Sequence, residues 1–257
     1  MSTGGQSVLA VTFEGFRKAL AQGGSWTVIV WILGCTMLMA LLGIALGYGA
    51  FGASLSSGFL TTLALHPAIS RLAPLALIGV VADMLIPPLV IGGMCGTLAQ
   101  AIQGRPVSWA TFWVLGLRLY GRSWGFIVYA LLFGAALTLV SAVFVPLFHL
   151  MAYPLLFIGV VVTIPITIRM LGGLFVDELS LGESLRRSFR RRAFGAIIVV
   201  AILIVAAASL PLGLLEMVAP RLGVAAQVLF GLALAALIPM MAAAWILSVY
   251  RAVSLEE

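Results

Sequence analysis

The stretch that decides the fold of this chain runs from Pro74 to Ala101 and has the sequence PLALIGVVADMLIPPLVIGGMCGTLAQA. It contains one charged residue, Asp83, and exceeds the length of about 20 residues that an α-helix needs to cross the hydrocarbon core of a bilayer. We therefore predict a transmembrane helix over 74–101 that is interrupted at Asp83 and at Pro87-Pro88.

The composition of the whole chain agrees with this stretch. Of its 257 residues, 63% are apolar and 9% are charged, and the mean hydropathy is +1.22. A soluble domain carries about 25% charged residues, so the composition excludes a soluble enzyme, a disordered tail, a fibrous protein and a secreted disulfide scaffold. We expect an all-α polytopic membrane protein that forms a single domain over 1–257.

Five other stretches are long and apolar enough to cross a membrane. Together with 74–101 they make six predicted transmembrane helices, at 26–47, 74–101, 124–150, 153–175, 194–215 and 222–249. The connection 48–73 is apolar and nearly uncharged. We therefore expect it to hold a helix that lies in the outer interface or packs across the bundle.

Three amphipathic stretches precede membrane segments. Each carries large apolar residues at helical spacing, which predicts interfacial helices at 7–22, 108–121 and 180–192. Ser180 and Glu183 have the spacing of a capping box. The chain is thus expected to repeat one unit three times, an interfacial helix followed by a transmembrane hairpin. The alternative is chance similarity among amphipathic stretches.

The basic residues predict the orientation of the chain. Of the 14 Lys and Arg residues, 11 fall on the two tails and on the connections after the second and fourth spans. Only Arg71 and Arg221 fall on the other side, and Arg169 lies within a span. Because cytoplasmic loops carry an excess of Lys and Arg, both termini are expected in the cytoplasm.

Two segments resemble a known group of proteins. They are residues 88–112, PLVIGGMCGTLAQAIQGRPVSWATF, which continue to a Gly-Leu-Arg at 116–118, and residues 177–190, DELSLGESLRRSFR. They are similar to a broad group of six-span bacterial inner-membrane proteins that includes the membrane domain appended to some glycerophosphodiester phosphodiesterases. The resemblance implies a multi-pass protein of the bacterial inner membrane. It implies no phosphodiesterase activity, because the matching motifs are structural rather than catalytic.

Asp83 is the first candidate for a functional residue. A charged residue at the centre of a membrane helix costs about 2.5–3.5 kcal/mol, so we expect it to face the bundle or a cavity. Pro87 and Pro88 follow one turn later and remove the donors for nearby backbone carbonyls. A carboxylate beside freed carbonyls predicts a proton, cation or ligand site. The alternative is a buried Asp that stabilises the packing at a kink.

The arginines supply the remaining candidates. Arg169 is interpreted as an anion or lipid contact or as a partner of Asp83, and the alternative is snorkelling to the interface. A cluster lies directly before the fifth span and is expected to contact anionic lipid or a protein partner at the cytoplasmic face, or to act only as a topology signal. Its members are Arg186, Arg187, Arg190, Arg191 and Arg192.

No other motif in the sequence indicates catalysis. His66 and His149 have no supporting Asp, Glu or Cys cluster, so we expect no metal site, and no cofactor or nucleic-acid partner is expected either. Few polar residues lie in the predicted bundle, so we expect no enzymatic activity. Two functions remain: a transport-related protein, either a small permease or the membrane subunit of an exporter, and a non-catalytic factor that binds lipids or stabilises a partner complex.

Overall fold

The computed structural model describes residues 8–51, 67–148, 152–189 and 224–255, with a few positions between 195 and 202. Within these ranges the chain is helical and contains no strand. The helices are α1 (Val8–Ala21), α2 (Gly23–Phe51), α3 (Pro67–Ile102), α4 (Thr111–Arg118), α5 (Tyr120–Phe148), α6 (Ala152–Phe175), α7 (Leu181–Ser188) and α9 (Val224–Ser254). Side chains are described for 8–42, for 77–142 apart from 83, 137 and 141, for 163–189 and for 230–255.

Four of these helices contain segments that are long and apolar enough to cross a membrane. The segments are Gly23–Leu42, Leu77–Ile102, Tyr120–Val140 and Phe230–Ser254, and each overlaps a predicted span. In α6 the apolar segment Thr163–Phe175 is shorter. The span predicted at 194–215 lies outside the described residues, apart from a few positions. The all-helical class is therefore confirmed, with four described helices that are long and apolar enough to cross a membrane.

The outer connection predicted at 48–73 is shorter than expected. Helix α2 continues to Phe51 and α3 already begins at Pro67, so both ends of the predicted connection belong to the flanking helices. Pro67 stands at the first position of α3, where a missing backbone N–H costs little and the fixed φ favours a helix. Residues 52–66, which include His66, lie outside the described residues, as does His149.

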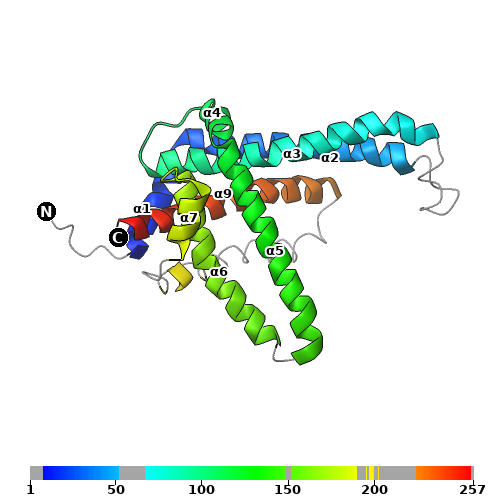
Figure 1. The fold of residues 1–257 in the computed structure, drawn as a ribbon. Coiled ribbons are helices and arrows are strands. Elements are labelled where there is room, and N and C mark those ends of the chain that lie inside the picture. Colours follow the sequence, from blue (N-terminus) through cyan, green and yellow to red (C-terminus); the bar gives the residue numbers. More distant parts are fainter. Residues whose placement is uncertain are drawn as a thin grey trace.

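The helices meet at one end of the molecule, which we call the junction. The junction consists of α1, α4 and α7, the C-terminal ends of α3, α6 and α9, and the N-terminal ends of α2 and α5. Figure 1 shows α2 and α3 side by side and leading away from the junction, while α5 and α6 leave it in another direction. Helices α1 and α9 lie in contact, so the beginning and the end of the described chain are neighbours.

Close helix approach at the junction depends on glycines of α3. A Cβ on Gly93 would lie 2.8 Å from the carbonyl oxygen of Phe112, and one on Gly96 would lie 2.8 Å from Leu119 Cδ1. Phe112 is fully buried beneath α3, and its ring stacks at 6.0 Å on Trp31 of α2. Helix α4 therefore packs directly against the backbone of α3, as glycine-mediated contacts in membrane bundles allow.

The short helices α1 and α7 bury only small or polar residues, whereas α4 also buries two large apolar ones. Helix α1 buries Thr12, Gly15 and Ala19, α4 buries Phe112, Leu115 and Gly116, and α7 buries Ser184 and Ser188. Other large apolar side chains remain exposed on each helix: Leu9 and Phe13 on α1, Val114 and Leu117 on α4, and Leu181 and Leu185 on α7, with Phe189 directly after it. The apolar stripe predicted on each helix is thus only partly buried against the bundle.

Candidate functional site

The loop 176–180, between α6 and α7, contacts four other parts of the junction. It bonds to α3 through Gln103, to α4 and α5 through two arginines, and to α9 through Tyr250. Helix α7, which follows the loop, also contacts it through an ion pair between Arg187 and Asp177. This loop therefore joins several of the described helices through polar side chains.

Glu178 lies at the centre of this network. Nη2 of Arg118 donates to both of its carboxylate oxygens, and Nη1 of Arg122 donates to Oε2 at 3.2 Å. Partial burial acts to raise the pKa of Glu178, but the hydrogen bonds and positive charges of the two arginines outweigh it and lower the pKa below its ordinary value. The carboxylate is therefore ionised at neutral pH and links α4 and α5 to the loop.

The backbone of Glu178 adopts a left-handed conformation, with φ of 53°. This is uncommon for a residue with a side chain, and it follows the last turn of α6. The backbone N–H of Asp177 donates to the carbonyl of Gly172 at 3.2 Å, and that of Leu179 donates to Gly173 at 2.8 Å. These bonds satisfy carbonyls at the helix end and direct the Glu178 side chain towards the arginines.

Asp177 connects the same loop to the last helix. Its Oδ2 accepts a hydrogen bond of 2.6 Å from the hydroxyl of Tyr250 and lies 3.7 Å from Nη1 of Arg187. The ring of Tyr250 packs on the bare backbone of Gly172, where any Cβ would overlap it. The loop is followed by the predicted capping box, in which Ser180 and Glu183 exchange backbone and side-chain hydrogen bonds at the start of α7.

The C-terminal end of α3 forms the side of the site that lies opposite the loop 176–180. The N–H of Gly104, at φ of 76°, donates to Ala101, and the N–H of Arg105 donates to Gln100 at 3.0 Å. These two bonds define a Schellman motif, which folds the chain back over the last turn. Arg105 is thereby placed beside Gln100, while Nε2 of Gln103 donates to the carbonyl of Val176 at 3.2 Å.

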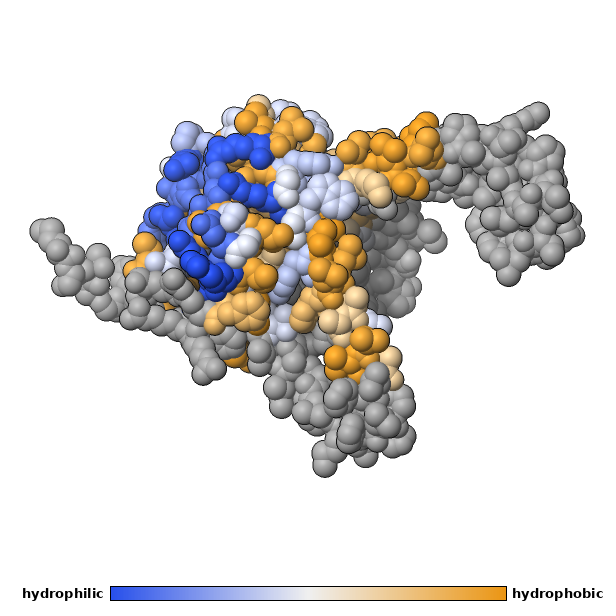
Figure 2. All heavy atoms as spheres, viewed as in Figure 1, coloured by the Kyte–Doolittle hydropathy of each residue, from blue (hydrophilic) through white to orange (hydrophobic). Residues whose placement is uncertain are grey.

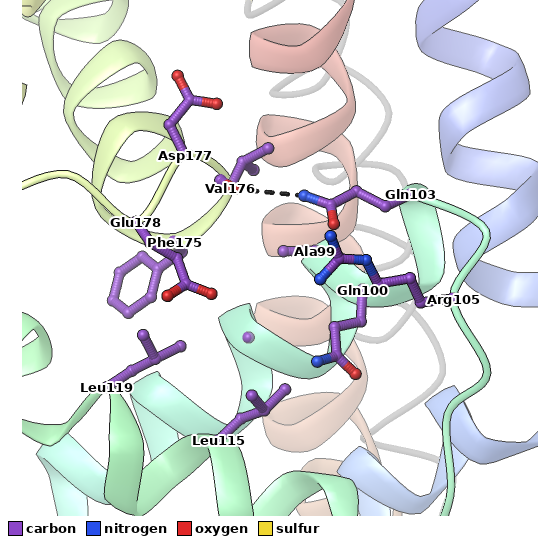
Figure 3. A pocket seen from close by; sticks show the side chains of 11 residues that line it. Ala99, Gln100, Gln103, Arg105, Leu115, Leu119, Phe175, Val176, Asp177 and Glu178 are labelled. Atoms are coloured by element: carbon purple, nitrogen blue, oxygen red, sulfur yellow. Dashed lines mark hydrogen bonds between the residues drawn. The ribbon is translucent and has the colours of Figure 1, made fainter.

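A cavity of about 230 Å³ lies between the two sides. Its polar lining comes from Gln100, Gln103 and Arg105 of the α3 end and from Asp177 and Glu178 of the loop. Figure 3 shows Arg105 and Glu178 facing the cavity from opposite sides, with apolar residues beneath them. Figure 2 shows hydrophilic residues gathered over this end of the molecule and hydrophobic ones on the helices that lead away from it.

Asp83 lies in a continuous part of α3, and its side chain lies outside the described residues. The interruption predicted at Pro87-Pro88 is wrong, because the helix continues through both prolines. Pro88 cannot donate to the carbonyl of Met84 four residues earlier. The hydroxyl of Tyr120 donates to that carbonyl instead, at 3.4 Å, which is one way in which membrane helices accommodate proline.

The predicted arginine sites are not brought together in one place. Arg169 is 4% exposed and lies in the last turns of α6, inside the bundle. Arg186 and Arg187 lie on the exposed side of α7, and Arg187 faces Asp177. The rest of the cluster, Arg190, Arg191 and Arg192, lies outside the described residues.

The cavity residues were missed by the sequence analysis, although a signal was present. The chain has only eight acidic residues, and Asp177 and Glu178 are two adjacent ones directly after a membrane span. Arg105, Arg118 and Arg122 were used only as part of the cytoplasmic charge that predicts the orientation of the chain. The acidic pair and these arginines lie at span ends on the same predicted side of the membrane, which favours ion pairs between them but does not specify a cavity.

No family model, curated protein or solved structure matches this chain.

Proposed function

We propose that this chain is a non-catalytic protein of the bacterial inner membrane whose junction faces the cytoplasm and binds anionic lipid. The proposal includes six spans, three repeats of an interfacial helix and a hairpin, and both termini in the cytoplasm. It also includes the resemblance to the six-span group that contains the membrane domain of some glycerophosphodiester phosphodiesterases.

The observation that carries the proposal is the arrangement of the short helices at the junction. Large apolar side chains stay exposed on all three; for example, Leu117 is 65% exposed, Phe189 62% and Phe13 55%. An amphipathic helix that keeps large apolar residues exposed beside its own bundle is suited to the boundary between headgroups and acyl chains. The short helices would therefore rest on the inner leaflet.

The charge beside these apolar residues supports an anionic lipid as the occupant. Arg17 and Lys18 on α1, Arg118 at the end of α4 and Arg186 on α7 are exposed. Basic residues near the cytoplasmic leaflet are each attracted to anionic lipid by about 1 kcal/mol. Lys18 and Arg118 have carboxylate partners, whereas Arg17 and Arg186 form no ion pair with a described residue.

The test is co-purification of the full chain in native nanodiscs, read by mass spectrometry for both lipids and proteins. We expect enrichment of anionic lipid over the surrounding membrane, and reduced enrichment in the double variant Arg17→Gln/Arg186→Gln. Arg251→Gln, which removes one charge from the end of α9, is the matched control. Equal enrichment in all three proteins would contradict the lipid proposal, and a stoichiometric ATPase partner would favour an exporter subunit.

Asp83 supports a second candidate function, transport. It lies in a continuous membrane helix one turn before Pro87 and Pro88, which leave carbonyls without their usual helical donors. If Asp83 carries a proton or a ligand, Asp83→Asn is expected to abolish activity in a growth or transport assay while the protein still inserts and purifies. Normal activity of this variant would exclude the role.

A further inference from the structure

We propose that the cavity between the end of α3 and the loop 176–180 binds a small phosphate-type anion, with Arg105 as its charged ligand. The site differs from the lipid-facing surface of the short helices, since its polar groups face a cavity between elements. The two proposals rest on different residues, so either can fail without the other.

The charges around the cavity favour an anion. Three charged residues line it: Arg105, Asp177 and Glu178. Both carboxylates are already paired with arginines that do not line the cavity, Asp177 with Arg187 and Glu178 with two others. Arg105 forms no ion pair within the part of the chain that the structure describes, so the lining has one uncompensated positive charge.

The backbone at Arg105 is fixed before any ligand arrives. Its backbone N–H is held by the carbonyl of Gln100 in the Schellman motif, and Pro106 follows it. Figure 3 shows its guanidinium beside the carboxamide of Gln103, with the side chain of Gln100 extending away from it towards Leu115. The Gln103 amide is held by Val176, whereas the Gln100 side chain bonds to no described residue and its NH2 group remains available as a donor.

The size and shape of the cavity favour a small oxyanion. Its volume of about 230 Å³ is below the roughly 300–1,000 Å³ of sites for drug-sized ligands. A planar guanidinium matches two oxygens of a phosphate, and a neighbouring amide adds a further hydrogen bond. The inner wall is apolar, with Ala99, Leu115 and Phe175, which strengthens electrostatic attraction relative to open water.

The same chemistry can come from two sources, a soluble phosphate compound or the headgroup of a phospholipid. To distinguish them, the full-length protein is delipidated in a maltoside detergent, which contains no phosphate. Inorganic phosphate is then titrated by calorimetry, and short-chain phosphatidic acid is titrated in parallel by native mass spectrometry. Binding of both probes indicates a soluble phosphate site, and binding of phosphatidic acid alone indicates a headgroup site.

Four variants test the assignment of residues. Arg105→Gln removes the charge, and Gln100→Glu places a carboxylate of the same size in the lining of the cavity; each is expected to weaken binding by about tenfold or more, because a charge-assisted hydrogen bond is lost or opposed. Arg105→Lys keeps the charge and is expected to retain most of the affinity. Arg251→Gln removes a charge outside the cavity and is expected to bind like the wild type.

Two results would overturn the proposal. One is equal affinity of the wild type and Arg105→Gln for the probe that binds. The other is the absence of saturable binding of both inorganic phosphate and phosphatidic acid by the wild type. Because Arg105 is exposed, its replacement is not expected to affect folding, and an unchanged melting temperature of Arg105→Gln confirms that any loss of affinity is local.

Discussion

The hydroxyl of Tyr250, near the end of the last helix, donates a 2.6 Å hydrogen bond to Oδ2 of Asp177 in the loop between α6 and α7. The two residues are 73 positions apart in the chain. This bond joins the C-terminal end of α9 to the loop that also holds α3, α4 and α5. Removing single members of this network therefore gives direct tests of how the junction is held together.

Tyr250→Phe is expected to lower the free energy of unfolding by about 1 kcal/mol and the melting temperature by about 2–4 °C. The change deletes one partly buried hydrogen bond and leaves the ring in place. Thermal unfolding in detergent measures the effect. Tyr120→Phe, which loses a longer and exposed bond of 3.4 Å to Met84, is the control and is expected to lose less. Equal losses in both variants would argue against a special role for Tyr250.

Gly172→Ala is expected to be strongly destabilising, because its Cβ would overlap the ring of Tyr250. Overpacking of this kind costs about 1–3 kcal/mol or more. Gly134→Ala in α5 is the matched control, since nothing lies near its Cβ and alanine favours a helix. We expect Tyr250→Ala, which removes the Cγ and ring atoms that this Cβ would meet, to restore part of the stability of Gly172→Ala. Failure of that rescue in a double-mutant cycle would place the clash elsewhere.

Glu178→Gln is expected to destabilise the junction at neutral pH, because Arg118 and Arg122 lose their carboxylate. The folded-state pKa of Glu178 is lowered from its ordinary value of 4.5. A lowered carboxyl pKa contributes stability that is fully present above the ordinary value and is lost as the pH falls through the folded value.

The measurement for Glu178 is the melting temperature of wild type and Glu178→Gln as a function of pH. The difference is expected to be constant from pH 7 down to about 5 and to shrink below 4.5. Glu14→Gln is the control, because the exposed pair of Glu14 and Lys18 lies within one helix and contributes little. A difference for Glu178→Gln that does not change between pH 7 and pH 3 would contradict the ion-pair account.

Phe112→Ala is expected to cost about 3–5 kcal/mol and to release α4 from α3. Phe112 is fully buried and contacts the glycine-lined side of α3 and the rings of Trp31 and Trp113. Val114→Ala, on the exposed side of the same helix, is expected to change stability by less than about 0.5 kcal/mol. Limited proteolysis at 103–110 measures the release. Similar cleavage of both variants would show that α4 is not held by Phe112.

The helical class and the positions of the long helices were predictable from local sequence, because membrane insertion requires only length and apolar composition. The segments 26–47, 74–101, 124–150 and 222–249 each coincide with a long helix of the structure. The continuity of α3 through Pro87 and Pro88 was not predictable. It depends on neighbouring residues, among them Tyr120, which supplies a donor to the carbonyl of Met84.

In the candidate site, too, some features follow from local sequence and others depend on how the helices pack. The capping box of Ser180 and Glu183 was predictable, because it involves residues three positions apart. The pairing of Tyr250 with Asp177 joins residues that are distant in sequence and meet only after the helices pack. The cavity itself is a space between two helix ends, and no local pattern specifies such a space.

The sequence by itself thus determined that this is an all-helical membrane protein with amphipathic helices beside its spans, because composition and periodicity act within one helix. Only the tertiary structure decided which side of each short helix is buried. In α1 the fully buried residues are Thr12, Gly15 and Ala19, while Phe16 and Leu20 are only partly buried, because small side chains allow helix backbones to approach closely. Close packing rather than hydrophobicity thus selects the buried face of α1 and α7, whereas the buried face of α4 also contains Phe112 and Leu115.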